Sequence, residues 1–206
     1  MKAMFQLVAV ALVSFVALTA CRQGTAESVA TVKADATART LEDLRHLSGE
    51  ELSALFAQGV ATPIPSQANP GVAADGAGLP IILPGDLIVS SFANQFWGGK
   101  IFTTDPTTGA TTLVNKLLNN SQQMIDAKVY AIPSSISTKD GKPSILLDYG
   151  ASNVVLAQSI RDEIRAIGPG LYLGRANVVN SRLAEILSGE KYRFVIWFAL
   201  SFSADQ

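Results

Sequence analysis

The chain has one cysteine and one histidine among its 206 residues, and this scarcity excludes several kinds of chemistry. A disulfide needs two thiols, so none can form within the chain. Metal sites of several histidines are excluded for the same reason. His46 lies in a polar, arginine-containing stretch ahead of the β-rich part, so we predict a surface residue and no Ser-His-Asp or Cys-His site. No metal and no cofactor are expected.

Charged residues are also few. They make up 16% of the chain, the formal net charge is −1, and no basic patch stands out. Nucleic-acid binding is therefore not expected. The length is sufficient for one domain with a sizeable core plus a tether. The oligomeric state is not predicted.

One long apolar run precedes the body of the chain. Lys2 supplies a positive charge, and Phe5 to Leu18 form an apolar stretch of 14 residues. This length is typical of a signal peptide. A helix of that length spans about 21 Å, less than the ~30 Å of bilayer hydrocarbon, so a permanent span is disfavoured. An ordinary secretory peptide is the alternative.

The end of this run, Leu18-Thr19-Ala20-Cys21, resembles the lipobox of bacterial lipoproteins. The resemblance implies that the thiol of Cys21 is alkylated with diacylglycerol, that cleavage precedes this residue, and that its new amino group is acylated (palmitate being a usual chain). Three acyl chains exceed what stable anchoring requires. Arg22, rather than aspartate, implies the outer membrane facing the periplasm in a Gram-negative host, or the plasma membrane in a Gram-positive one.

Composition divides the chain into four parts. Residues 1–20 are the predicted signal peptide, and residues 21–39 are a small, polar, flexible tether. Residues 40–85 are expected to form a short helix and then a Pro/Gly-rich extended segment without regular structure. Residues 86–206 are expected to form a β-barrel-like domain.

Two local patterns predict helices. Ser48 and Glu51 form a capping box ahead of an apolar stripe that ends near Gly59, and residues 40–46 can form a preceding turn. A second helix is expected near 181–189. Residues 86–97 are assigned a short helix, a strand being the alternative.

The remainder is rich in β-prone runs separated by turn signals, such as Asp105 to Gly109 and Lys139 to Pro143. Residues 160–167 fit either a helix or a strand, and the turn after them favours a strand. Six or seven strands predict a mainly β fold, an antiparallel lipocalin-like barrel or strongly curved sheet with one or two short helices. The expected strands are 100–104, 111–117, 124–132, 144–149, 160–167, 171–179 and 192–202.

Short motifs recur along this β-rich part. They are W-x-G-K-x-F from Trp97, then Asp148-Tyr149, then R-D-E-I-R from Arg161, and G-x-Y-L-G around Tyr172. Their order resembles uncharacterised small bacterial domains of the GXWXG type, which look lipocalin-like. The resemblance covers about residues 90–200 and implies no particular activity. Trp97 is otherwise a large core residue, with Lys100 over its ring or paired with a carboxylate.

The run from Arg161 to Arg165 alternates in charge. In a strand, Arg161, Glu163 and Arg165 share one face, and Asp162 lies on the other face with Ile160 and Ile164. The charged face then lines either a polar pocket inside the barrel or a solvated outer surface.

These patterns support three hypotheses for function. The first is an anchored protein whose barrel binds a small apolar or amphipathic ligand. The second is a structural or protein-interaction lipoprotein, and the third is an enzyme using Asp148 and Asp162 as acid and base. An enzyme is the less favoured reading. The candidate ligand pocket consists of Trp97, Lys100, Asp148, Tyr149, Arg161, Asp162, Arg165 and Tyr172.

Overall fold

The computed structural model describes residues 39–67, 71–79, 97–117, 126–130, 135–152 and 155–202, with the side chains of 126–130, 156 and 184 left aside. The predicted signal peptide, Cys21 and nearly all of the tether lie outside the described residues. Most of the predicted 86–97 helix does so as well.

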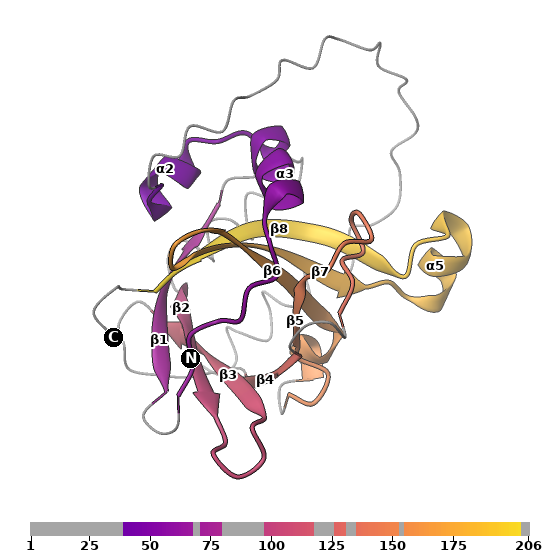
Figure 1. Ribbon diagram of the computed structural model, residues 1–206. Coiled ribbons are helices and arrows are strands. Elements are labelled where there is room, and N and C mark those ends of the chain that lie inside the picture. The colour runs from indigo at the N-terminus through magenta and orange to yellow at the C-terminus, as the bar shows by residue number, and fades with distance from the viewer. Residues whose placement is uncertain are drawn as a thin grey trace. The chain divides into compact units, whose positions relative to one another are not determined.

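The described strands form one closed antiparallel barrel in which each strand pairs with its sequence neighbour and β1 pairs with β8 (Figure 1). This confirms the predicted mainly β fold. The eight strands are β1 (Val72–Gly78), β2 (Trp97–Thr104), β3 (Thr111–Leu117), β4 (Asp126–Tyr130), β5 (Ile145–Asp148), β6 (Ile160–Gly168), β7 (Leu171–Val179) and β8 (Tyr192–Ser201).

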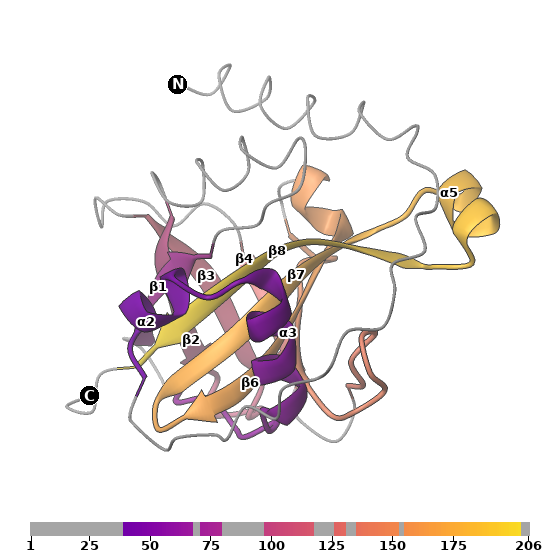
Figure 2. The ribbon, with the colours of Figure 1, turned by 90° about the horizontal axis from the view of Figure 1, so that it is seen from above.

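Two short helices, α2 (Leu41–Arg45) and α3 (Gly49–Gln58), lie over the outside of β7 and β8 (Figure 2). Each begins with a capping box, Thr40 with Asp43 and Ser48 with Glu51. These boxes satisfy backbone N–H groups that would otherwise lack partners at the helix start. The predicted 48–58 helix and the turn before it are both confirmed.

Two further helical elements interrupt the later strands. A 3₁₀ helix, η1 (Val155–Ser159), precedes β6, and helix α5 (Arg182–Ser188) joins β7 to β8. The predicted helix near 181–189 is confirmed. So is the strand assignment of residues 160–167, which are part of β6.

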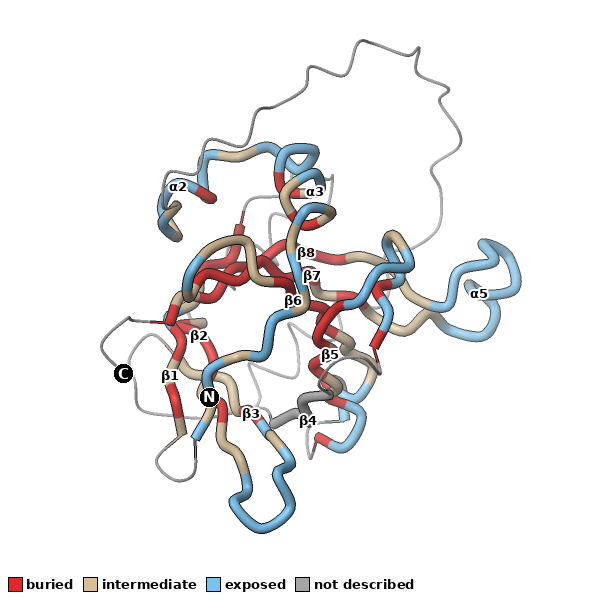
Figure 3. Tube along the Cα trace, in the orientation of Figure 1, coloured by how far each residue is buried: buried red, intermediate tan, exposed pale blue. Residues whose placement is uncertain are grey.

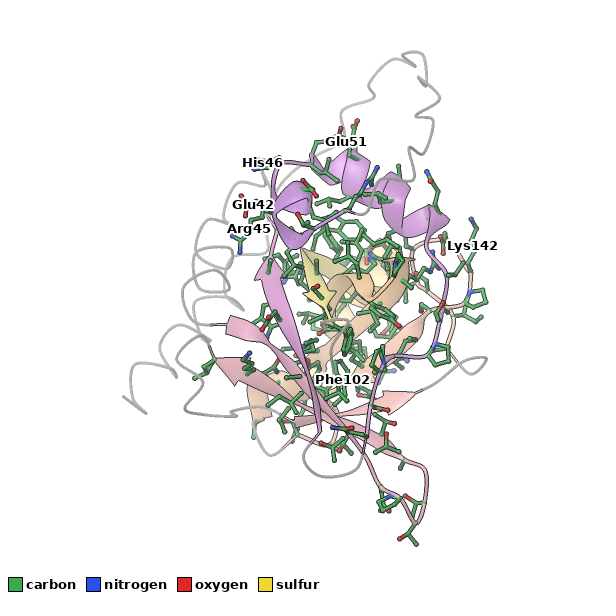
Figure 4. All side chains as sticks on the ribbon, turned by 60° about the vertical axis from the view of Figure 1, so that its left-hand side comes forward. Glu42, Arg45, His46, Glu51, Phe102 and Lys142 are labelled. Carbon is green, nitrogen blue, oxygen red and sulfur yellow. The ribbon has the colours of Figure 1, made fainter. Side chains whose placement is uncertain are left out.

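Side chains pack into two apolar clusters, one on each face of the barrel wall. The inner cluster lies on the inward face of the strands and includes Phe102, Leu147, Ile164 and Phe198. The outer cluster joins helix residues, including Phe56, to β7 and β8. Figure 3 shows the buried positions along the barrel strands, and Figure 4 shows Phe102 within the barrel.

On helices α2 and α3 the solvent side is mainly polar. His46 is exposed at the end of α2, with its Nε2 3.3 Å from a carboxylate oxygen of Glu42, which confirms its predicted surface position (Figure 4). The outer cluster therefore depends on one apolar face of each helix. Leu44, Leu52 and Phe56 from that face are fully buried. Burial of such a side chain contributes about 1.5–3 kcal/mol.

The prediction was wrong about Val72–Gly78, which lies in the segment 61–85 that was expected to be mostly without regular structure. Val72–Gly78 forms β1 and closes the barrel by pairing with β2 and β8. The barrel therefore begins before residue 86, and the described residues supply eight strands to it. The segment before β1 does run extended over the core, since Val60 bridges to Ala166 and Gln67 to Thr103.

Candidate functional site

Trp97 enters the barrel wall at the start of β2, where glycines make room for it. The β2–β3 pairing is irregular between Trp97 and Gly99, and Gly99 has a φ of +127°. A Cβ on Gly99 would lie 2.0 Å from the carbonyl oxygen of Ala74, and one on Gly76 would lie 2.6 Å from the Trp97 ring. Only glycine combines this backbone angle with so close an approach of two strands. The Trp-Gly-Gly sequence thus sets the entry of β2.

Lys100 extends from β2 into the barrel and is almost fully buried. Its Nζ donates hydrogen bonds to Asn115 Oδ1 at 3.0 Å, to Asp162 Oδ2 at 3.3 Å and to the hydroxyl of Tyr149. Trp97 Nε1 donates to the same oxygen of Asn115 at 2.9 Å. An ammonium group has three donors, and all three are used here. We call these five residues the inner polar site.

Aromatic rings surround the amine. Lys100 Nζ lies 5.4 Å from the ring centroid of Trp97, 5.1 Å from that of Tyr149 and 5.2 Å from that of Phe198. Trp97 and Phe198 meet edge to face, with ring centroids 5.7 Å apart. A cation within about 6 Å of such rings is attracted by their quadrupoles. The predicted positions of Lys100, over the Trp97 ring and paired with a carboxylate, are both confirmed.

Desolvation controls the ionisation of this site. Burial lowers the pKa of Lys100, while the carboxylate of Asp162 partly opposes that change. Burial raises the pKa of Asp162, against the opposing effect of Lys100, and it raises the pKa of Tyr149 well above its usual value. Each group is therefore moved toward its neutral form. The amine and the acid titrate as a coupled pair inside the barrel.

One carboxylate oxygen of Asp162 has no hydrogen-bond partner in the part of the chain that the structure describes. Asp162 is 4% exposed, and its Oδ1 is buried without a hydrogen bond to any described residue. An unsatisfied buried acceptor costs roughly 1–3 kcal/mol. A hydroxyl or amine hydrogen placed at this oxygen would remove that cost. The site thus offers one open acceptor between aromatic walls.

The candidate pair Asp148 and Arg161 lies elsewhere. Asp148 Oδ1 forms an ion pair with Arg161 Nη1 at 2.9 Å and accepts a hydrogen bond from the backbone N–H of Gly150 at 2.7 Å. In the β5–β6 register Asp148 faces Arg161 and Leu147 faces Asp162. Neighbouring residues of a strand point to opposite faces, so Asp148 and Asp162 are not a carboxylate pair. The acid–base hypothesis thereby loses its paired groups.

Tyr172 shares the barrel interior but not the inner polar site. Its hydroxyl donates to the carbonyl oxygen of Pro63 at 2.8 Å, and its ring meets Phe202 edge to face. Burial raises the pKa of this phenol. Its contacts tie the segment before β1 to the barrel interior.

The charged face of β6 lies outside the barrel, which corrects the pocket hypothesis for Arg161 and Arg165. The predicted alternation itself is right, because Asp162 and Ile164 lie inward while Glu163 and Arg165 lie outward. The solvated alternative is also wrong for two residues, since Glu163 is 3% exposed and Arg165 is fully buried. Helix α3 and residues 137–143 supply their partners.

Arg165 uses all five of its N–H groups. It forms two hydrogen bonds to the carboxylate of Asp140, at 2.7 and 2.8 Å, and its other three go to the carbonyl oxygens of Phe56, Lys142 and Pro143. Its guanidinium carbon lies 4.4 Å from the Phe56 ring centroid. The bidentate pair lowers the pKa of Asp140 to about 2. Arg165 therefore fastens helix α3 and the loop before β5 to the barrel wall.

Glu163 lies beside Arg165 on this outer face. It accepts hydrogen bonds from Ser137 Oγ at 2.6 Å and from the backbone N–H and hydroxyl of Thr138, and its Oε2 is 3.6 Å from Arg175 Nη1. Burial lowers the pKa of Arg175, and the attraction of Glu163 opposes this. The Nε of Arg175 lacks a partner among the described residues. We call Asp140, Glu163, Arg165 and Arg175 the outer polar cluster.

Sequence reasoning missed two members of the site and its surroundings, Asn115 and Phe198. Asn115 follows Leu113 by two residues in β3, so a polar residue on the inward face was a readable signal. Phe198 lies opposite Gly174 in the β7–β8 register, and a Cβ added to Gly174 would lie 2.3 Å from the Phe198 ring. That pairing requires the topology, which the sequence pattern does not supply.

Within the described ranges, no group of three or more His, Cys, Asp or Glu residues is placed to hold a metal ion. In the same part of the chain, every helix is too short or too polar to cross a bilayer.

No protein-family model matches the chain, and no curated protein matches it either. A crystal structure of a protein from Thermomonospora curvata is similar, with a TM-score of 0.42, 13% sequence identity, and coverage of 76% of this chain and 88% of that chain.

Proposed function

We propose that the chain is a lipid-anchored protein of the bacterial envelope whose barrel binds a small amphipathic molecule. The anchor rests on Leu18-Thr19-Ala20-Cys21, and Arg22 favours the outer membrane in a Gram-negative host. Membership of the GXWXG-type domains remains a prediction, and it is consistent with the lipocalin-like barrel. The binding proposal rests chiefly on Asp162 Oδ1, which lies beside Lys100 and has no hydrogen-bond partner among the described residues.

The surroundings of this oxygen define the ligand class. Three aromatic rings around Lys100 and the inner apolar cluster favour a largely apolar body. The three hydrogens of Lys100 are already used, whereas the open oxygen of Asp162 accepts one hydrogen bond. The head group therefore carries a donor, a hydroxyl or an amine. A carboxylate head would place a second acceptor against Asp162 and is disfavoured.

Native mass spectrometry of the protein isolated from its own host tests the binding proposal. We expect a small molecule to travel with the unaltered chain and to be lost from Asp162→Asn, whose amide presents a different hydrogen-bond pattern. Asp148→Asn is the matched control, because Asp148 lies on the opposite face of the barrel wall. Retention by both variants, or no bound molecule in any of them, would contradict the proposal.

The anchor has its own test. Intact mass analysis of the membrane-isolated protein is expected to show loss of residues 1–20 and acyl chains on Cys21. Cys21→Ser should remain unprocessed, and its mass is the comparison. An unmodified thiol in the natural protein would refute the anchor and leave the barrel proposal standing.

A further inference from the structure

Helix α5 carries apolar side chains that the described protein does not cover. Leu183, Ile186 and Leu187 are exposed to 66%, 70% and 78%. Their spacing places them on one helical face. Figures 1 and 2 both show α5 at the far end of the β7–β8 ribbon, away from the barrel, and Figure 3 shows it exposed.

This grouping distinguishes α5 from other exposed apolar residues. Val60, Ile136 and Val155 are also exposed, but each belongs to a different segment. Scattered exposed apolar residues are ordinary, whereas a cluster marks a contact surface. The three residues of α5 therefore require an occupant outside the described chain.

Charge around the helix indicates the kind of occupant. Arg182 begins α5, and Lys191 and Arg193 follow it, against the acidic Glu185 and Glu190. Lys191 Nζ lies 5.5 Å from the ring centroid of Tyr192, which begins β8. An apolar helical face flanked by basic side chains and a tyrosine suits a bilayer interface with anionic head groups.

We propose that the α5 tip, residues 182–193, inserts its apolar face into the surface of a lipid bilayer. This rests on the anchor part of the proposed function, which holds the protein at such a surface. The stretch 22–38 between Cys21 and the described residues spans at most about 60 Å when extended. That reach permits the tip to touch the membrane from many orientations, and the tip contact then selects one of them.

Spin labelling of the whole chain tests this. Acylation blocks Cys21, so Ile186→Cys gives one free thiol for a nitroxide, and Thr107→Cys in the exposed β2–β3 turn is the matched control. The protein, made with its own first 20 residues, is placed in vesicles of phosphatidylethanolamine and phosphatidylglycerol. The ratio of oxygen to nickel-chelate accessibility is measured at both positions. The unaltered chain, which has neither added cysteine, is treated with the same label, and its signal is subtracted as background.

The ratio at position 186 is expected to exceed that at 107 several-fold. Leu183→Ser combined with Leu187→Ser should return it to the control value. A 186 label that stays in water overturns the proposal. A label shielded from both reagents also overturns it. Spin–spin coupling between such labels would identify a second copy of the chain as the occupant, and shielding without coupling would identify another protein.

Intact mass of the same preparation reports acylation separately. An acylated protein whose 186 label remains in water overturns the α5 proposal and leaves the anchor. An unacylated protein whose 186 label has a high oxygen accessibility overturns the anchor and leaves the α5 proposal. The two proposals therefore fail by different observations.

Discussion

The two faces of β6 handle buried charge in opposite ways. On the outer face, Arg165 satisfies five donors and lies against Phe56. On the inner face, Asp162 has one oxygen bonded to Lys100 and the other without a partner among the described residues. A fully paired charge fixes structure, because removing it leaves several buried groups unsatisfied. A partly paired charge can still accept a hydrogen bond from another molecule, which is why we propose that the ligand binds at the inner face.

The largest expected effect comes from breaking the outer face. Arg165→Met would strand the Asp140 carboxylate and three backbone carbonyls that are now satisfied. We expect the free energy of unfolding, measured by urea titration, to fall by about 3–5 kcal/mol. Arg161→Met, which removes a partly exposed pair, should cost about 1 kcal/mol or less. Equal losses would remove the distinction between a fastening arginine and a peripheral one.

Breaking the inner pair should cost less and be recoverable. Lys100→Met leaves Asp162 buried without its cation, so we expect a loss of about 2–4 kcal/mol in the free energy of unfolding at neutral pH. Adding Asp162→Leu removes the stranded acid and should recover much of that loss. If the double variant is no more stable than the single one, the inner pair fastens the barrel as Arg165 does.

The two faces should respond to pH in opposite directions, because the pKa of Asp140 is lowered and that of Asp162 is raised. The pKa of Asp140 is about 2 in the folded protein, against 3.8 for an unperturbed aspartate as in the unfolded chain. The ionised carboxylate therefore stabilises the fold above about pH 4, and this stabilisation is lost as pH falls toward 2. Asp140→Asn should therefore lower stability by about 1–2 kcal/mol at neutral pH, after allowance for partial exposure, and by almost nothing at pH 2. For Asp162, whose pKa is raised, the sign reverses. The free energy of unfolding of Asp162→Asn, taken relative to that of the unaltered protein, should therefore increase as pH rises. Urea titrations of both variants across this pH range test the difference. If the free energy of unfolding changed with pH in the same direction for Asp140→Asn and Asp162→Asn, the opposite roles of the two carboxylates would be wrong.

The smallest effect is expected at α5. Leu183→Ser and Leu187→Ser remove exposed side chains, so each should change the free energy of unfolding by less than about 0.5 kcal/mol. Leu173→Ser, a fully buried counterpart on β7, should cost several times more. A large loss from the α5 variants would mean that this face packs against the protein, and the membrane contact would then have no free surface.

Much of the fold followed from local patterns. The capping box at Ser48 and Glu51 placed α3, and the alternation within residues 160–167 placed β6. Strand β1 was missed because Val72–Gly78 is rich in alanine and glycine, which have low β-propensity. Its small residues are explained by close packing, since Gly76 lies against Trp97. Pairing with two neighbouring strands overrides the local preference.

The candidate site was half predictable. Trp97, Lys100, Tyr149 and Asp162 meet as members of one site, drawn together from β2, β6 and the end of β5. Alternation identified which residues of β6 share a face, but it contains no information on which face lies inward. That depends on helix α3 covering the outside, a contact between segments about a hundred residues apart. The sequence therefore left open whether Arg161 and Arg165 face the inside or the outside of the barrel.

A crystal structure of the protein isolated from its own envelope tests the central claim most directly. We predict a hydroxyl or amine of a bound small molecule within hydrogen-bond distance of Asp162 Oδ1, with its apolar part among the aromatic rings around Lys100. A lone ordered water at that oxygen, with protein side chains filling the rest of the barrel, would contradict it.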